Sequence, residues 1–218
     1  MGDVGEGSGR SWLAGPVLEV APRLLGAVVT TALPDGVVSV RLTEVEAYDG
    51  ETDPGSHAFR GRTARNDVMF GPAGFLYVYR HLGLHVCANV VTGVDGRASA
   101  ILLRGGEVVD GVDLARERRR RRGVVRSDVE LARGPARLAD ALGITLELYG
   151  SEVVTGAGTV HLAAPAAPAR GWATGPRVGV SGPGGDGDAY PWRFWLPDEP
   201  TVSTYRRAAP RRRRPPGE

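Results

Sequence analysis

The fold is decided by residues 27–47, which read AVVTTALPDGVVSVRLTEVEA. Both flanks are rich in β-branched residues, which favour strands. Between them, Pro34, Asp35 and Gly36 form a turn signal, because proline presets one backbone angle and glycine tolerates the left-handed region. The stretch therefore predicts an antiparallel hairpin of Ala27–Leu33 and Val37–Ala47. Side chains alternate along a strand, so Glu44 and Glu46 are expected on one face near its far end.

The rest of the chain also predicts short strands joined by turns, together with a few helices. Further strands are expected at Phe75–Tyr79, Leu84–Val91, Ala98–Arg104, Thr159–Ala163, Arg177–Val180 and Trp192–Leu196, and helical segments at Trp12–Gly26, Arg65–Met69, Val112–Arg122 and Pro135–Leu142. Hairpins predominate over βαβ units, which predicts a single mixed α/β (α+β) domain, a curved and mostly antiparallel sheet with flanking helices. The length of 218 residues fits one domain, which we place at residues 11–205. Residues 1–10 and the basic tail 206–218 are expected to be disordered.

Composition narrows the class of protein. A hydrophobic content of 42% is enough for a core, and the single Cys87 excludes an intramolecular disulfide framework. We expect a cytoplasmic protein with no membrane partner, since the sequence shows neither an apolar run of about 20 residues nor an apolar signal core. His81, His85 and Cys87 lie close together, but one cysteine is a weak zinc signal, so no metal or other cofactor is expected.

Charge points to an anionic partner. All 27 basic residues are arginine, and they cluster at Arg116–Arg122, at Arg211–Arg214 and in a loop around Arg60. Either of the first two clusters alone is typical of a solvated helix face or a tail. Together with the loop they favour a polyanion such as nucleic acid. The absence of lysine removes the usual amine for Schiff-base chemistry.

Short motifs in a fixed order carry a resemblance to a known family. They are EVEAY at 44–48, His57, Arg62 to Asn66, MF at 69–70, GFLYVY at 74–79, CAN at 87–89, LLR at 102–104, residues 134–143, GPRVG at 175–179 and WRF at 192–194. In this order they resemble the alkyladenine (3-methyladenine) DNA glycosylase family over roughly residues 12–204. The resemblance implies a compact α/β domain with a positively charged DNA face. It also implies a monofunctional, cofactor-free hydrolase of base excision repair, which removes alkylated or deaminated purines from double-stranded DNA by cleaving the N-glycosidic bond. We expect a monomer.

The resemblance also implies roles for residues of the expected pocket. Glu46 matches the catalytic base, with Glu44 as the second choice. Tyr48, His57 and Tyr79 match the side chains that sandwich the flipped base, as aromatic faces can.

Outside that sandwich, Asn89 matches the pocket floor, where its amide would clash with the exocyclic amine of guanine. Arg104 matches an arginine near the flipped nucleotide, and Arg62 and Arg65 match phosphate-contacting positions. Leu82 departs from the family pattern. It stands at the tip that fills the vacated base stack, where familiar members carry tyrosine, and leucine can also act as a wedge.

Two alternatives stay open from the sequence. The first is a protein that binds damaged nucleic acid without cutting it, and the second is a nucleosidase acting on free nucleosides. A pure binder has no need of the Glu46 carboxylate in its pocket, and a nucleosidase needs neither the arginine loop nor the Leu82 tip.

Overall fold

A computed structural model describes residues 9–208. The predicted hairpin lies at the centre of its sheet. Strand β1 (Val28–Leu33) pairs with β2 (Gly36–Tyr48) from Leu33 opposite Gly36 at the turn to Val28 opposite Arg41. On its other side, β2 pairs along most of its length with β5 (Ala100–Asp110). Beyond the end of β1, the strand β8 (Arg193–Trp195) pairs with β2.

The remaining strands extend the sheet from this centre. They are β3 (Leu76–His81), β4 (His85–Val91), β6 (Val160–Ala163) and β7 (Ala173–Gly175). The order is β3-β4-β5-β2-β1-β6, with β8 on β2 and β7 on β8, and each pair is antiparallel. The predicted mixed α/β domain with an antiparallel sheet is confirmed.

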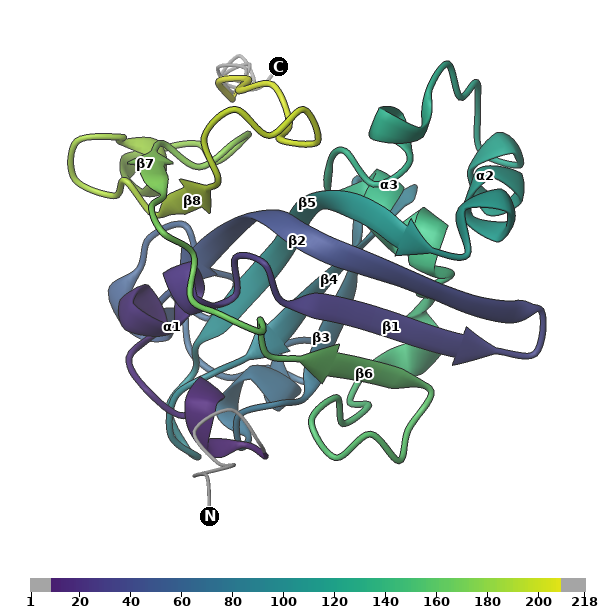
Figure 1. Cartoon of the computed structure of the whole chain (residues 1–218). Coiled ribbons are helices and arrows are strands. Elements are labelled where there is room, and N and C mark those ends of the chain that lie inside the picture. The colour runs from purple at the N-terminus through teal and green to yellow at the C-terminus, as the bar shows by residue number, and fades with distance from the viewer. Residues whose placement is uncertain (1–8, 209–218) are drawn as a thin grey trace, which may run out of the picture.

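Three α-helices flank the sheet in the described part of the chain: α1 (Val17–Arg23), α2 (Val112–Arg120) and α3 (Pro135–Leu142). Helix α3 packs on β4, β5 and β2, α2 packs against α3, and α1 lies against β2. Figure 1 shows α2 and α3 together at one end of the sheet and α1 at the other. Short 3-10 turns lie at Ser11–Leu13, Gly50–Thr52, Asp67–Phe70, Asp128–Glu130, Leu146–Leu148 and Pro183–Gly185.

Three sequence predictions about the elements need correction. The helical entry begins only at Val17, because Pro16 separates α1 from the preceding 3-10 turn. The strand expected at Arg177–Val180 is absent, since Arg177 sends its side chain into the interior and Gly179 turns the backbone with φ +73°. The strand expected to end at Arg104 continues to Asp110.

A β-bulge in β2 decides which face of the sheet its side chains occupy. Before the bulge the even-numbered residues, such as Val40 and Leu42, point into the main core. The register with β5 shifts between Leu42 and Val45, and after it the odd-numbered Val45 and Ala47 point into the core. Strict alternation would have sent Glu44 and Glu46 into that core, whereas the bulge turns them to the opposite face. Bulges often re-aim side chains in this way next to active sites.

Two glycines of β5 make room for this bulge. A Cβ added at Gly106 would lie 2.4 Å from the carbonyl oxygen of Arg41. A Cβ at Gly105 would lie 3.0 Å from Oε2 of Glu44 and 3.1 Å from the carbonyl oxygen of Thr201. The backbone of β5 therefore approaches the bulge more closely than a side chain permits.

Several arginines of α2 form ion pairs within the protein. Arg118 and Arg119 are buried and pair with Asp35 and Asp140 respectively, and Arg116 pairs with Asp128. The pairs of Arg118 and Arg119 hold α2 against the β1–β2 turn and α3, whereas Arg120, Arg121 and Arg122 are exposed.

The ends expected to be disordered lie largely outside the described residues, as does the whole of Arg211–Arg214. At the inner edges, Arg10 donates to the carboxylate of Glu152 at 2.6 Å, and the carbonyl of Arg206 accepts from the backbone of Gly179 at 3.1 Å. Among residues 9–208, no helix is long and apolar enough to cross a membrane.

Candidate active site

The site is built on one row of residues that crosses four strands. Tyr77 of β3 lies opposite Asn89 of β4, Asn89 opposite Leu102 of β5, and Leu102 opposite Glu46 of β2. Neighbouring strands are about 4.8 Å apart, so the row places the Cα atom of Glu46 about 14 Å from the Cα atom of Tyr77. Since the alternate residues of these strands face the core, the row and its same-face neighbours form the floor of a pocket on the other side.

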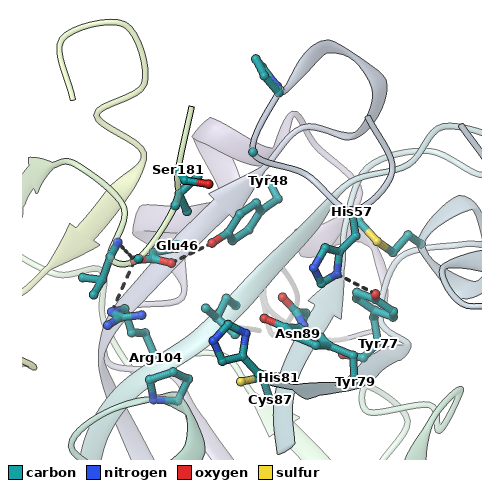
Figure 2. Close-up of a pocket in the computed structure, with 18 residues that line it drawn as sticks. Glu46, Tyr48, His57, Tyr77, Tyr79, His81, Cys87, Asn89, Arg104 and Ser181 are labelled. Atoms are coloured by element: carbon teal, nitrogen blue, oxygen red, sulfur yellow. Dashed lines mark hydrogen bonds and ion pairs between the residues drawn. The ribbon is translucent and has the colours of Figure 1, made fainter. Parts of the chain in front are cut away.

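This pocket has a volume of about 440 Å³, within the range of small-ligand sites. Six predicted site residues meet there, and Figure 2 shows Glu46 and Tyr48 on one side and His57 and the tyrosines of β3 on the other, with Asn89 between. Its lining consists of Glu46, Tyr48, Pro54, Gly55, His57, Met69, Tyr77, Tyr79, His81, Cys87, Asn89, Leu102, Arg104, Pro135, Val178, Gly179, Val180 and Ser181.

The Glu46 carboxylate is held by three donors. Its Oε1 accepts from the backbone N–H of Val178 at 2.7 Å and lies 3.4 Å from Nε of Arg104. Its Oε2 accepts from the hydroxyl of Tyr48 at 2.9 Å. Burial, and then the Glu46 charge, raise the pKa of Tyr48 well above its usual value, so this hydroxyl remains a donor at neutral pH. The carboxylate is thus fixed in orientation within the wall of the pocket.

Glu44 lies behind Glu46 and has a different environment. Both residues are fully buried, but only Glu46 lines the pocket. Through its Oε1, Glu44 accepts from Nε of Arg104 at 2.8 Å and from Nε of Arg193 at 2.6 Å. The backbone N–H and hydroxyl of Ser203 donate to it at 2.7 and 3.0 Å. With all its contacts made inside the protein, Glu44 orients Arg104, and Glu46 is the carboxylate that lines the pocket.

The opposite wall is aromatic. Nδ1 of His57 lies 2.8 Å from the hydroxyl of Tyr77, and the His57 ring meets the edge of Tyr79 with 4.6 Å between ring centroids. Tyr77 and Tyr79 stack with centroids 5.5 Å apart. Burial, followed by the charges of Arg65 and His81, lowers the pKa of His57, so its ring is neutral at neutral pH.

Burial also keeps the remaining polar groups of this wall neutral. It raises the pKa of Tyr77 to about 12 and that of the Cys87 thiol to about 11. Asn89 donates from Nδ2 to the carbonyl of Tyr77 at 3.0 Å, which fixes its amide on the floor. The pocket therefore presents Glu46 opposite a wall with no net charge of its own.

Three predicted DNA-contacting residues lie outside the pocket. Leu82 is 80% exposed at the tip between β3 and β4, in a tight turn closed by a hydrogen bond from Leu84 to His81. Arg65 lies over the ring of Tyr79 at 6.0 Å, and exposed Arg62 is paired with Asp67 at 2.6 Å. The structure thus brings Arg65 to the rim of the pocket, whereas the charge of Arg62 is already partnered.

Sequence reasoning missed several residues of the site. Tyr77 had no assigned role, although it lies on the same face of β3 as Tyr79 and lines the pocket. Asn66 had no assigned role, yet its buried amide donates to the carbonyl oxygens of His57 and Gly61 and shapes the loop that carries His57. Val178 lies in the GPRVG motif, but its N–H had no assigned role, because a backbone donor leaves no mark on residue type.

Comparison with known proteins settles the family. Residues 11–200 match the family described as methylpurine-DNA glycosylase (MPG). The chain belongs to the methylpurine-DNA glycosylase family. A protein of Streptomyces avermitilis named "Putative 3-methyladenine DNA glycosylase" is 53% identical over 207 residues, covering 94% of each chain. A protein of Leifsonia xyli with the same name is also 53% identical, covering 91% of this chain and 92% of its own.

Membership of this glycosylase family makes the protein a DNA-repair enzyme. It is a DNA glycosylase, a hydrolase of N-glycosyl bonds that acts on DNA in base excision repair. Among residues 9–208, no three His, Cys, Asp or Glu side chains are grouped as a metal site would require.

Proposed function

We propose that this enzyme flips alkylated or deaminated purines out of duplex DNA and hydrolyses their N-glycosidic bond with Glu46 as catalytic base. The observation that supports this most directly is the Glu46 carboxylate facing His57, Tyr77 and Tyr79 across one pocket. Flipping a base costs a few kcal/mol, and stacking on aromatic rings returns about 1–3 kcal/mol. The proposed enzyme acts as a monomer on damaged double-stranded DNA.

The chemistry follows from the charges in the pocket. Cleavage passes through a sugar with oxocarbenium character, which a nearby carboxylate stabilises electrostatically. The same carboxylate positions a water molecule and accepts its proton. In this scheme Tyr48 and Val178 hold Glu46 at the sugar while Arg104 lies beside it.

The neutral state of His57 matters for the choice of base. An alkylated purine is cationic, and the electron-rich faces of Tyr48 and Tyr79 attract a cation. A protonated His57 would repel it, but the lowered pKa of His57 keeps that ring uncharged at neutral pH. The aromatic rings on the two sides of the pocket thus favour a cationic base.

The test is base release from duplex oligonucleotides that contain 3-methyladenine or hypoxanthine, with chelator present. Wild-type protein is expected to release free base and leave an abasic strand that breaks only in alkali, because the chain has no lysine for a lyase step. Glu46→Gln is expected to abolish release and to bind the lesion duplex nearly as well. The matched control is Glu107→Gln, which alters an exposed glutamate outside the pocket and should excise normally.

Two results would contradict the proposal. If the wild-type protein binds the lesion tightly and never releases base, it is a damage-binding protein. If it cleaves free nucleosides as fast as duplex DNA, it is a nucleosidase.

A further inference from the structure

Among residues 9–208, Arg177 has the largest side chain that is fully buried. Its Nη1 and Nη2 bind the two carboxylate oxygens of Asp53 at 2.5 and 2.6 Å. The same two nitrogens donate to the carbonyl oxygens of Ala47 and Gly184, each at 2.9 Å. The Nε of Arg177 is buried without a hydrogen-bond partner. A buried ion pair is weak evidence for stability, since desolvation offsets the attraction, so this pair points to another role.

The guanidinium lies against the back of the pocket. Its central carbon is 4.6 Å from the ring centroid of Tyr48 and 5.2 Å from that of Trp192. Tyr48 donates to Glu46 and lines the pocket, so Arg177 supports the ring from behind.

The backbone links Arg177 directly to the carboxylate. Arg177 binds the carbonyl of Ala47, and the next residue, Val178, donates its N–H to Glu46, the residue before Ala47. Two adjacent residues of one segment therefore bind two adjacent residues of β2. Any shift of Arg177 also shifts the N–H that holds Glu46.

Close packing leaves this segment little freedom. A Cβ added at Gly55 would lie 2.4 Å from Nη2 of Arg177, and a Cβ at Gly184 would lie 2.3 Å from the backbone nitrogen of Gly55. The glycine-rich loop therefore fits closely around the Arg177–Asp53 pair, next to Pro54 and Gly55 of the pocket lining.

We propose that Arg177, paired with Asp53, is a positioning residue for glycosidic-bond hydrolysis, which sets the Val178 N–H and the Tyr48 ring against Glu46. This inference rests on the proposed catalytic role of Glu46. It predicts that loss of the pair lowers the rate of the chemical step more than it weakens the binding of damaged DNA.

The experiment uses the double variant Arg177→Met/Asp53→Asn, which removes both charges and so avoids an unpaired buried ion. In single-turnover excision of 3-methyladenine we expect a fall of roughly ten- to a hundredfold, the effect of one misplaced hydrogen bond to a charged group. The dissociation constant for the lesion duplex should change by less than roughly fivefold. The control is Arg118→Met/Asp35→Asn, the same change at a buried arginine of α2 outside the pocket, which should keep the wild-type rate.

A second measurement does not depend on enzyme activity. In the wild-type protein the amide proton resonance of Val178 should move when Glu46 is changed to Gln. In the Arg177→Met/Asp53→Asn background the same change should no longer move it. This readout stays informative even if the wild-type protein releases no base, in which case the proposed function fails and the positioning contact is still tested.

Three results would overturn the inference. The first is a folded double variant that excises at the wild-type rate, and the second is an equal loss of rate in the Arg118 control. The third is a Val178 resonance that still responds to Glu46. Should the double variant not fold, Arg177→Lys replaces it, because lysine keeps the charge but cannot contact Asp53, Ala47 and Gly184 at once. A wild-type rate in Arg177→Lys would equally refute the role.

Discussion

Replacing Glu44 with glutamine tests whether this residue is structural while Glu46 is chemical. The Glu44 carboxylate is fully buried and is the only acidic partner of Arg193 within the described residues. It also binds Arg104, whose other carboxylate partner, Glu46, is farther away at 3.4 Å. In the glutamine variant Arg193 has no carboxylate partner left within the described residues, and Arg104 keeps only the more distant Glu46. An amide nitrogen also replaces one of the oxygens that accept hydrogen bonds.

Removing one partner of a buried ion pair typically costs about 3–5 kcal/mol. For a domain of this size each kcal/mol lowers the melting temperature by about 2–4 °C, so Glu44→Gln should melt roughly 6–20 °C below the wild type. Urea denaturation followed by circular dichroism measures the free energy of unfolding directly. Glu107→Gln is the matched control, because its ion pair with Arg41 is exposed and should contribute less than about 1 kcal/mol. A loss for Glu44→Gln no larger than that of the control would refute the assignment of Glu44 as a structural ion.

Three further predictions address the pocket and its rim. Leu82→Tyr should tighten binding to a lesion duplex by about tenfold, through added stacking. An unchanged dissociation constant would show that Leu82 is not the wedge. Cys87, the only cysteine, should react with iodoacetamide at pH 8 about a hundredfold more slowly in the folded than in the urea-unfolded protein, because burial raises its pKa from 9.0 to about 11. His57 has a pKa lowered by burial, so the unfolded chain binds its proton first and the free energy of unfolding should fall as the pH drops below about 6.5. In a urea titration His57→Gln should show a shallower fall, and an identical pH dependence would contradict this reading.

Local patterns in the sequence predicted the parts of the fold that depend on neighbouring residues. The hairpin around Pro34–Gly36 was predicted correctly, because turn chemistry and β-branched flanks act within a few residues. Helix α3 has the predicted bounds, Pro135–Leu142, since proline starts it and Gly143 ends it with φ +70°.

The site could be predicted as a set of residues but not as a geometry. Glu46, Tyr48, His57, Tyr79, Asn89 and Arg104 were all expected in one pocket, and all of them line it. Their roles remain predictions that the experiments above address.

The sequence by itself determined which residue types are available and which strands alternate. Only the tertiary structure decided that Glu46 faces a pocket, because the bulge in β2 forms against Gly105 and Gly106 of a distant strand and reverses the alternation. It also decided what holds this carboxylate, since Val178 is 132 residues from Glu46, and Arg177 is 124 from Asp53. Contacts over such separations depend on how the sheet brings the chain back on itself, and no pattern of neighbouring residues encodes them.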